Sequence, residues 1–96
     1  MKNYFIYFFL FLFSLSGFAQ EISVKGCVTD SDTGEPLIGA NVKIKGKSSG
    51  TITDVNGDFH LQASSDDILV VSFIGYIDQE ISINNRNTIN IHLTED

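Results

Sequence analysis

Residues 50–63 read GTITDVNGDFHLQA, and this stretch contains the pattern on which the fold depends. Residues 50–53 predict a short strand. Residues 58–63 predict a second strand, because apolar and polar side chains alternate there with a period of two. Between them, Asp-Val-Asn-Gly at residues 54–57 predicts a tight turn, since Asn-Gly accepts the positive φ angles that a hairpin needs.

The same alternation recurs on both sides of this hairpin. It is found at residues 22–29, 40–45, 76–83 and 88–93. Residues 68–73 read ILVVSF, and this nearly continuous apolar run predicts a central strand that is covered on both faces. No stretch keeps the 3.6-residue period of a helix, so seven short strands separated by turns indicate an antiparallel β-sandwich or barrel.

The inward positions of these strands define the expected core. Gly26 occupies one of them, which predicts either a β-bulge or a closely packed neighbour. Residues 30–36, DSDTGEP, form a dense cluster of turn formers that includes the single proline. The expected inward apolar residues are Ile22, Val24, Val28, Ala40, Val42, Ile44, Phe59, Leu61, Ala63, Phe73, Ile77, Ile81, Ile83, Ile89, Ile91 and Leu93.

The first 19 residues read as a signal peptide. Lys2 gives a positive start, residues 4–13 are wholly apolar or aromatic, and Gly17 and Ala19 precede the expected cleavage site before Gln20. The alternative is a membrane anchor, but residues 4–19 are shorter than the roughly 20 residues that a spanning helix needs. We therefore expect an exported protein whose mature chain, residues 20–96, has no membrane-spanning segment.

The mature chain is acidic. It keeps all 12 acidic residues and five of the six basic ones, so the formal net charge moves from −6 to −7. This charge argues against nucleic-acid binding, because phosphate contacts need lysine and arginine. The one basic cluster, Lys43, Lys45 and Lys47, reads as the solvated face of a strand. Cys27 is the single cysteine, so an intrachain disulfide is impossible, and it reads as a partly buried free thiol.

Two groups of residues are candidate metal ligands. Asp54, Asn56 and Asp58 resemble the start of a calcium loop, but an EF-hand would need a glutamate where Ser65 stands, so a turn is the preferred interpretation. His60 and His92 have no second ligand at zinc-ligand spacing. Neighbouring strands can still bring the two histidines together, so a weak metal site stays open at this point.

No catalytic constellation is visible. The serines lack a Gly-x-Ser-x-Gly elbow, and no glycine-rich phosphate loop is present. Asp66 and Asp67 are adjacent in a turn, where two carboxylates need not converge on one substrate. We therefore predict no catalytic residue, no cofactor and no metal, and a protein that is not an enzyme.

Four ordered motifs resemble a known family. They are VKGCVTD at residues 24–30, TGEPLIGANV at 33–42, GTITDVNGDF at 50–59 and LVVSFIGY at 69–76. Together they resemble the carboxypeptidase-regulatory-like domain of the transthyretin (prealbumin) type. More narrowly, they resemble the copy at the N-terminus of SusC/RagA-type TonB-linked outer-membrane proteins. Cys27 departs modestly from the family, which more often has threonine or another β-former at that position.

The resemblance implies a fold and a location. The fold is a seven-stranded antiparallel Greek-key β-sandwich over residues 20–96, after the signal peptide at residues 1–19. The location is the periplasm or the outer membrane of a Gram-negative cell. In SusC-type transporters of glycans or peptides, such a domain precedes a TonB-contacting segment, a plug and a barrel. This chain stops where that segment would begin, so we expect a truncated transporter or a free-standing module.

The resemblance also implies a non-catalytic interaction module. The zinc-dependent carboxypeptidase domain that gives the family its name is a separate unit. Relatives that hydrolyse hydroxyisourate have a His/Arg site and a Tyr-Arg-Gly-Ser-type end, whereas this sequence ends His-Leu-Thr-Glu-Asp. The expected partners are other envelope proteins of the TonB-linked uptake apparatus, and an edge strand of the sandwich is a candidate docking surface.

Tyr76 is the one residue that the sequence singles out as a candidate for an interaction surface. It falls on the outward side with Asp78 and Glu80, so its ring either joins a docking face or places its hydroxyl against a neighbouring turn. The alternative function is a free-standing β-sandwich that binds a carbohydrate or another small ligand. Sugar sites favour exposed aromatic platforms, and Tyr76 is the one expected exposed ring of residues 20–96.

Overall fold

A computed structural model of the protein describes residues 20–96, and the signal peptide predicted at residues 1–19 lies outside that range. The described part contains strands and turns and no helix. The seven strands are β1 (Glu21–Asp30), β2 (Asn41–Ile44), β3 (Gly50–Ile52), β4 (Asp58–Ser64), β5 (Ile68–Ser72), β6 (Gln79–Ser82) and β7 (Ile91–Leu93).

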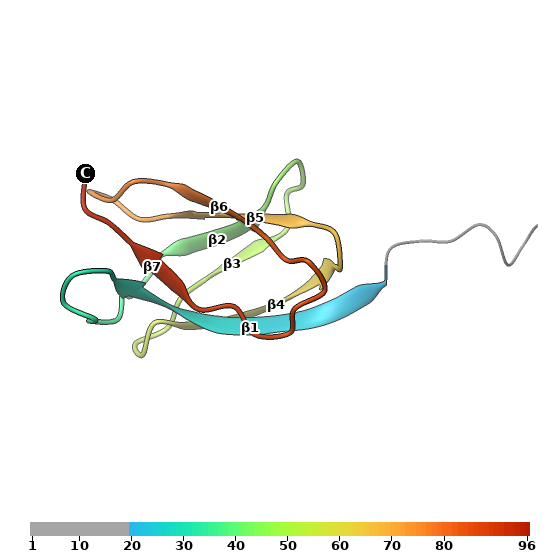
Figure 1. The fold of residues 1–96 in the computed structure, drawn as a ribbon, viewed down its shortest axis with the longest axis horizontal. Helices are drawn as coiled ribbons and strands as arrows, with labels where there is room; N and C mark the ends of the chain where they lie inside the picture. Colours follow the sequence, from blue (N-terminus) through green and yellow to red (C-terminus); the bar gives the residue numbers. More distant parts are fainter. Residues whose placement is uncertain (1–19) are drawn as a thin grey trace, which may run out of the picture.

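The strands form two sheets that face each other across one core (Figure 1). One sheet has the order β4-β1-β7, and the other has the order β3-β2-β5-β6. The inward side chains of both sheets meet between the layers, as the alternation predicts. The buried apolar residues are Val24, Val28, Leu37, Ala40, Val42, Ile44, Phe59, Ala63, Leu69, Val71, Ile83, Ile89, Ile91 and Leu93.

The expectation of a wholly antiparallel fold is wrong for one strand pair. β1 pairs antiparallel with β4 but parallel with β7, where Val28 lies opposite Ile91. Parallel neighbours need a crossover between them. Here the connection from β1 to β7 runs through β2 to β6, and its last part, β5 and β6, lies in the second sheet before β7 returns beside β1 in the same direction.

Gly26 marks a close approach between two chain segments. A Cβ atom at this position would lie 1.7 Å from the carbonyl oxygen of Ile89. The approach is fixed by backbone hydrogen bonds on either side, from Ile89 N to the Lys25 oxygen at 2.9 Å and from Lys25 N to the Asn87 oxygen at 2.9 Å. Of the two alternatives for Gly26, the closely packed neighbour is therefore confirmed.

Two predictions about burial are wrong, the cover of residues 68–73 on both faces and the inward position of Ile77. In β5, Leu69 and Val71 are buried, but Ile68 and Val70 are half-buried on the other face, so this interior strand is covered on one side only. Ile77 is 52% exposed. β6 begins only at Gln79, and before it the chain turns at Gly75 (φ 86°), so the strand alternation does not extend back to Ile77.

The turn at residues 54–57 is tight, but it does not close a hairpin. β3 and β4 belong to different sheets, so the turn carries the chain from one layer to the other. Gly57 has a positive φ of 77°, whereas Asn56 does not. Asp54 organises the turn, because its Oδ1 accepts hydrogen bonds from the N–H groups of Asn56 and Asp58 at 2.9 and 3.0 Å. One residue with a left-handed backbone conformation, Gly57, is thus sufficient to form this turn.

Candidate interaction surface

Tyr76 is anchored by its hydroxyl group. The ring is partly buried against the core and lies 5.6 Å from the Phe73 ring, centroid to centroid. The hydroxyl donates a hydrogen bond of 2.6 Å to Oδ2 of Asp30. Oδ1 of Asp30 accepts hydrogen bonds from the backbone N–H groups of Asp32 and Thr33, at 2.7 and 3.0 Å. One carboxylate therefore joins the turn after β1 to the turn after β5.

The protonation of this pair follows from its hydrogen bonds. The Tyr76 hydroxyl, followed by the backbone N–H groups of Thr33 and Asp32, lowers the pKa of Asp30 below its usual value of 3.8. The hydrogen bond to Asp30, desolvation, and the charges of Asp30 and Glu95 raise the pKa of Tyr76 to about 12. At neutral pH the carboxylate is therefore ionised and the phenol is neutral, so the phenol is the donor.

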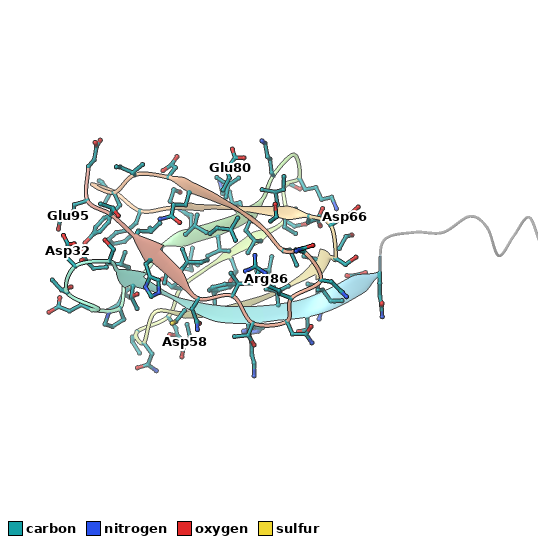
Figure 2. The ribbon with its side chains drawn as sticks, viewed as in Figure 1. Asp32, Asp58, Asp66, Glu80, Arg86 and Glu95 are labelled. Carbon is teal, nitrogen blue, oxygen red and sulfur yellow. The ribbon has the colours of Figure 1, made fainter. Side chains whose placement is uncertain are left out.

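Tyr76 stands at the end of the sandwich where the chain ends. The backbones of Tyr76 and Glu95 form an isolated antiparallel β-bridge. On either side of it, Ile77 N donates to the Thr94 oxygen at 2.9 Å, and Asp96 N donates to the Gly75 oxygen at 3.0 Å. The turn after β1, the β5–β6 turn and the last residues gather at the left of Figure 1, and Figure 2 shows Asp32 and Glu95 there.

The most exposed apolar side chain at this end is Ile74. It is 91% exposed, and Ile77, three residues later, is 52% exposed. Sequence reasoning did not single out Ile74, because a residue in a turn has no alternation partner that would mark its exposure as unusual. The Tyr76 side chain is thus held in place by its hydrogen bond to Asp30. The exposed apolar side chains close to it in the sequence are those of Ile74 and Ile77.

The structure does not bring His60 and His92 together. They lie on β4 and β7, the two strands that flank β1, where His60 is opposite Lys25 and His92 is opposite Thr29. His92 Nδ1 and Thr29 Oγ1 share a hydrogen bond of 2.8 Å. Within residues 20–96, no three His, Cys, Asp or Glu side chains are close enough together to hold a metal ion.

Cys27 lines a shallow depression on the outer face of the three-stranded sheet. The depression has a volume of about 500 Å³, and its lining includes Lys25, Asp58, His60 and Asn90. The Cys27 thiol is partly buried, with Sγ 3.5 Å from Oδ1 of Asn90. The hydrogen-bond partner of the thiol in this lining is thus the Asn90 amide, which is not a base.

Two of the three clustered lysines, and Asp67 of the Asp66–Asp67 pair, have structural partners. Lys45 pairs with Glu80 at 2.9 Å, and Lys47 pairs with Asp67 at 3.2 Å. Asp67 also accepts a hydrogen bond of 2.8 Å from Ser64 N through the same oxygen, Oδ2. Asp67 therefore holds a turn, while Asp66 beside it is exposed.

Across residues 20–96 there is no helix with the length and apolar character needed to cross a membrane. The sequence of residues 24–96 matches the family model of the CarboxypepD_reg-like domain. The chain belongs to the CarboxypepD_reg-like domain family. The family that the four sequence motifs resemble is thereby confirmed.

Curated relatives of this CarboxypepD_reg-like domain include TonB-dependent receptors. It is 59% identical to the TonB-dependent receptor SusC of Bacteroides thetaiotaomicron over 70 residues, which cover 73% of this chain and 7% of the receptor. It is 35% identical to the TonB-dependent receptor P3 of Formosa agariphila over 91 residues, which cover 92% of this chain and 9% of the receptor. The chain thus spans less than a tenth of the length of these curated relatives.

Solved structures share the fold of this CarboxypepD_reg-like domain. A protein of unknown function from Bacteroides fragilis NCTC 9343 superposes with a TM-score of 0.56 and 25% identity, covering 78% of this chain and 28% of that one. A chain of a type II cohesin–X-dockerin complex from Acetivibrio cellulolyticus superposes with a TM-score of 0.54 and 22% identity, covering 76% of this chain and 52% of that one. The second likeness concerns the fold alone.

Proposed function

We propose that this CarboxypepD_reg-like domain is a non-catalytic interaction module of the cell envelope, equivalent to the N-terminal region of SusC-type TonB-dependent receptors. The observation that carries the proposal is the 59% identity to SusC over 70 residues. Identity at this level extends over the surface as well as the core, whereas a shared fold alone would need only the buried positions to be alike.

The proposal includes a route and a location. Residues 1–19 act as a signal peptide that is removed before Gln20, and the remainder functions in the periplasm or at the outer membrane of a Gram-negative cell. The domain is a Greek-key sandwich of the transthyretin type. Its chain path supports this, because hairpins in one sheet alternate with single strands in the other. Its partners are proteins of the TonB-linked uptake apparatus.

A binding role for the end of the sandwich around Tyr76 fits this function. The exposed side chains of Ile74 and Ile77 flank Tyr76, whose hydroxyl is held by Asp30. A fixed turn that presents apolar side chains loses little conformational entropy when a partner binds. The carbohydrate-binding alternative has less support, because Phe59 is buried and the rings of Phe73 and Tyr76 are both partly buried against the core.

The proposal is tested in a cell that produces SusC-type receptors. The full chain, tagged at its C-terminus, is expressed there, fractionated, and cross-linked in intact cells. We expect a mature N-terminus at Gln20 in the envelope fraction and cross-links to TonB-linked uptake proteins, with an unrelated exported β-sandwich as the control. A cytoplasmic product, or the same cross-links as the control domain, would contradict the proposal.

The alternative function has its own experiment. Glycan binding by the purified full chain that disappears in Tyr76→Ala, but not in the solvent-exposed substitution Ile52→Ala, would favour a carbohydrate-binding sandwich. We expect no glycan binding that depends on Tyr76.

A further inference from the structure

β4 forms an edge of the three-stranded sheet, and the direction of its backbone groups can be deduced from its pairing with β1. At the two ends of this ladder, Val28 N donates to the Gly57 oxygen at 2.8 Å, and Ser65 N donates to the Gln20 oxygen at 2.9 Å. Hydrogen-bonded pairs alternate with non-bonded pairs in an antiparallel ladder. The odd-numbered residues of β4 therefore bond to β1, and the even-numbered residues direct N–H and C=O away from it.

Aspartates satisfy the outward groups at both ends of this edge. Asp58 N donates to Oδ1 of Asp54 at 3.0 Å, and Asp54 N donates to the Asp58 oxygen at 2.9 Å. At the other end, Ser64 N donates to Oδ2 of Asp67 at 2.8 Å, and Asp67 N donates to the Ser64 oxygen at 3.0 Å. Two residues remain between these caps, His60 and Gln62. In the described part of the chain, their four outward backbone groups have no backbone partner.

The other edges of the described sandwich are shorter or better protected. β3 has three residues and begins with Gly50. Beside β7, the His92 oxygen accepts a hydrogen bond from Nε2 of Gln79 at 2.5 Å, so this edge is tied to the other sheet. β6 carries the charged Glu80, and the Ser82 oxygen accepts a hydrogen bond from Nη2 of Arg86.

β4 has seven residues, and after Asp58, which belongs to the cap at its start, it contains no lysine, arginine, aspartate, glutamate or proline. Native edge strands are usually short, charged, kinked or covered, because an open edge pairs with other chains. The continuous register from Cys27–Asp58 to Glu21–Ser64 also rules out a bulge within this ladder. β4 is therefore the edge of the described sandwich that lacks the usual protection.

Negative charge lies at both ends of the β4 edge. Asp54 and Asp58 stand at its beginning, and Glu21 lies opposite Ser64 at its end, with Asp66 in the following turn. Figure 2 shows Asp58 and Asp66 at opposite ends of β4. The middle of the edge carries the side chains of His60 and Gln62 on the outer face and the partly buried Leu61 on the inner face.

A hollow of about 170 Å³ lies beside the second half of β4. Its lining includes Gln62 and Ser64 from the edge itself, the acidic residues Glu21 and Asp67, and Lys47. Since Lys47 already pairs with Asp67, the acidic groups outnumber the basic one. A long basic side chain on an added strand would find carboxylate oxygens here.

We propose that the β4 edge binds an extended segment of a partner protein, in which β-branched residues lie between a basic residue at each end. The added strand pairs with the backbone of His60 and Gln62, and its basic ends meet the two acidic ends of β4. This inference rests on the proposed interaction function and names its surface. A second copy of this chain is a poor occupant, because it would bring the same acidic ends and the same net charge of −7 over residues 20–96.

The first experiment uses the full chain and a defined synthetic probe. The probe is a nine-residue peptide, blocked at both termini, in which valine and threonine alternate between a lysine at each end. The control peptide has glutamate at each end. We expect the lysine peptide to protect the amides of His60 and Gln62 from hydrogen exchange. We expect the glutamate peptide to bind at least tenfold more weakly, and binding of the lysine peptide to weaken in high salt.

Two variants locate the binding. Gln62→Pro removes an outward N–H group while keeping the ladder to β1, and Glu80→Pro is its matched control on β6. We expect peptide affinity to fall at least tenfold in the first variant and to stay unchanged in the second. The variant Glu21→Gln with Asp66→Asn alters only exposed side chains, so it covers the case in which Gln62→Pro fails to fold. There we expect severalfold weaker binding of the lysine peptide.

Three outcomes would overturn this inference. These are equal binding of the two peptides, protection at another edge, or a concentration-dependent dimer whose protected amides are those of β4. The last would make a second copy the occupant. If envelope cross-links persist unchanged in Gln62→Pro, the proposed function stands and the β4 inference fails. If the wild-type chain gives no envelope cross-links, it is the proposed function that fails.

Discussion

The hydroxyl of Tyr76 donates a hydrogen bond of 2.6 Å to Oδ2 of Asp30, a residue 46 positions earlier in the chain. Asp30 ends β1 and is 6% exposed, and its other oxygen holds the backbone of the following turn. The contact therefore connects the end of one sheet to the β5–β6 turn of the other, next to the residues where the chain ends.

Replacing Tyr76 by Phe tests the strength of this connection. The ring would keep its packing, but the Asp30 carboxylate would lose its strongest donor, so we expect the melting temperature to fall by roughly 5 °C or more. Thermal unfolding at neutral pH measures the change. Thr29→Val is the control, because it removes an exposed hydrogen bond to His92 and should have a smaller effect. An equal effect of both substitutions would show that the Tyr76–Asp30 contact has no special role.

The same pair predicts how stability depends on pH. The pKa of Asp30 is lowered on folding, so its contribution is complete above pH 3.8 and is lost as the pH falls through the lower pKa of the folded state. The pKa of Tyr76 is raised from 10.0 to about 12, so its contribution is present below pH 10 and is lost as the pH rises toward 12.

Unfolding curves at a series of pH values measure both effects. Asp30→Asn should flatten the acid limb, and Tyr76→Phe should flatten the alkaline limb, because each variant lacks the titrating group. The double variant should lose less than the sum of the two single variants, since both remove the same hydrogen bond. Additive losses would contradict a shared contact.

Gly26→Ala should be severely destabilising. The new Cβ would lie 1.7 Å from the Ile89 oxygen, and the hydrogen bonds around Lys25 and Ile89 prevent the two segments from separating. We expect a loss of about 3 kcal/mol or more in the free energy of unfolding. Gly34→Ala is the control, because it meets no atom within 4 Å and bears only the strain of φ +75°, about 1–2 kcal/mol. Similar losses in denaturant unfolding would argue against the close approach.

Thr53→Val should destabilise the protein, because the core needs the Thr53 hydroxyl group as a hydrogen-bond partner. Thr53 is buried, and its Oγ1 donates to the Leu37 oxygen at 2.5 Å and accepts from Ala40 N at 2.9 Å. Valine fills the same volume but leaves both backbone groups unpaired, so we expect a loss of roughly 2–4 kcal/mol. In Thr51→Val, on the edge strand β3, we expect stability within about 0.5 kcal/mol of wild type. A neutral Thr53→Val would mean that the two backbone groups find other partners.

Local patterns predicted most of the strands and little of their arrangement. Alternation located β1, β4 and the inward side chains of Val24, Val28, Phe59 and Ala63, because burial on one face of a strand leaves a mark at every second residue. It misplaced Ile77, because alternation continues through a stretch of sequence whether or not the backbone stays extended. The Asn-Gly turn was located correctly, but a turn motif does not reveal whether the next strand joins the same sheet.

The candidate surfaces depended even more on tertiary structure. The sequence placed Tyr76 on the outward side of a strand and gave two alternative roles for it, a docking face or a hydrogen bond to a neighbouring turn. Its partner Asp30 was found only in the folded chain, since the hydrogen bond spans 46 residues. The β4 edge was equally hidden, because the free backbone groups of His60 and Gln62 depend on which strand is at the edge and on the caps formed by Asp54 and Asp67.

The sequence by itself determined the all-β class, the acidic charge and the family. Each of these follows from composition, from short periodic patterns or from ordered motifs, which are local properties of the chain. Only the tertiary structure decided the parallel pairing of β1 with β7, the Tyr76–Asp30 contact and the unprotected edge at β4. These depend on which distant segments become neighbours, and that choice is made by burying the inward faces of all seven strands in one core.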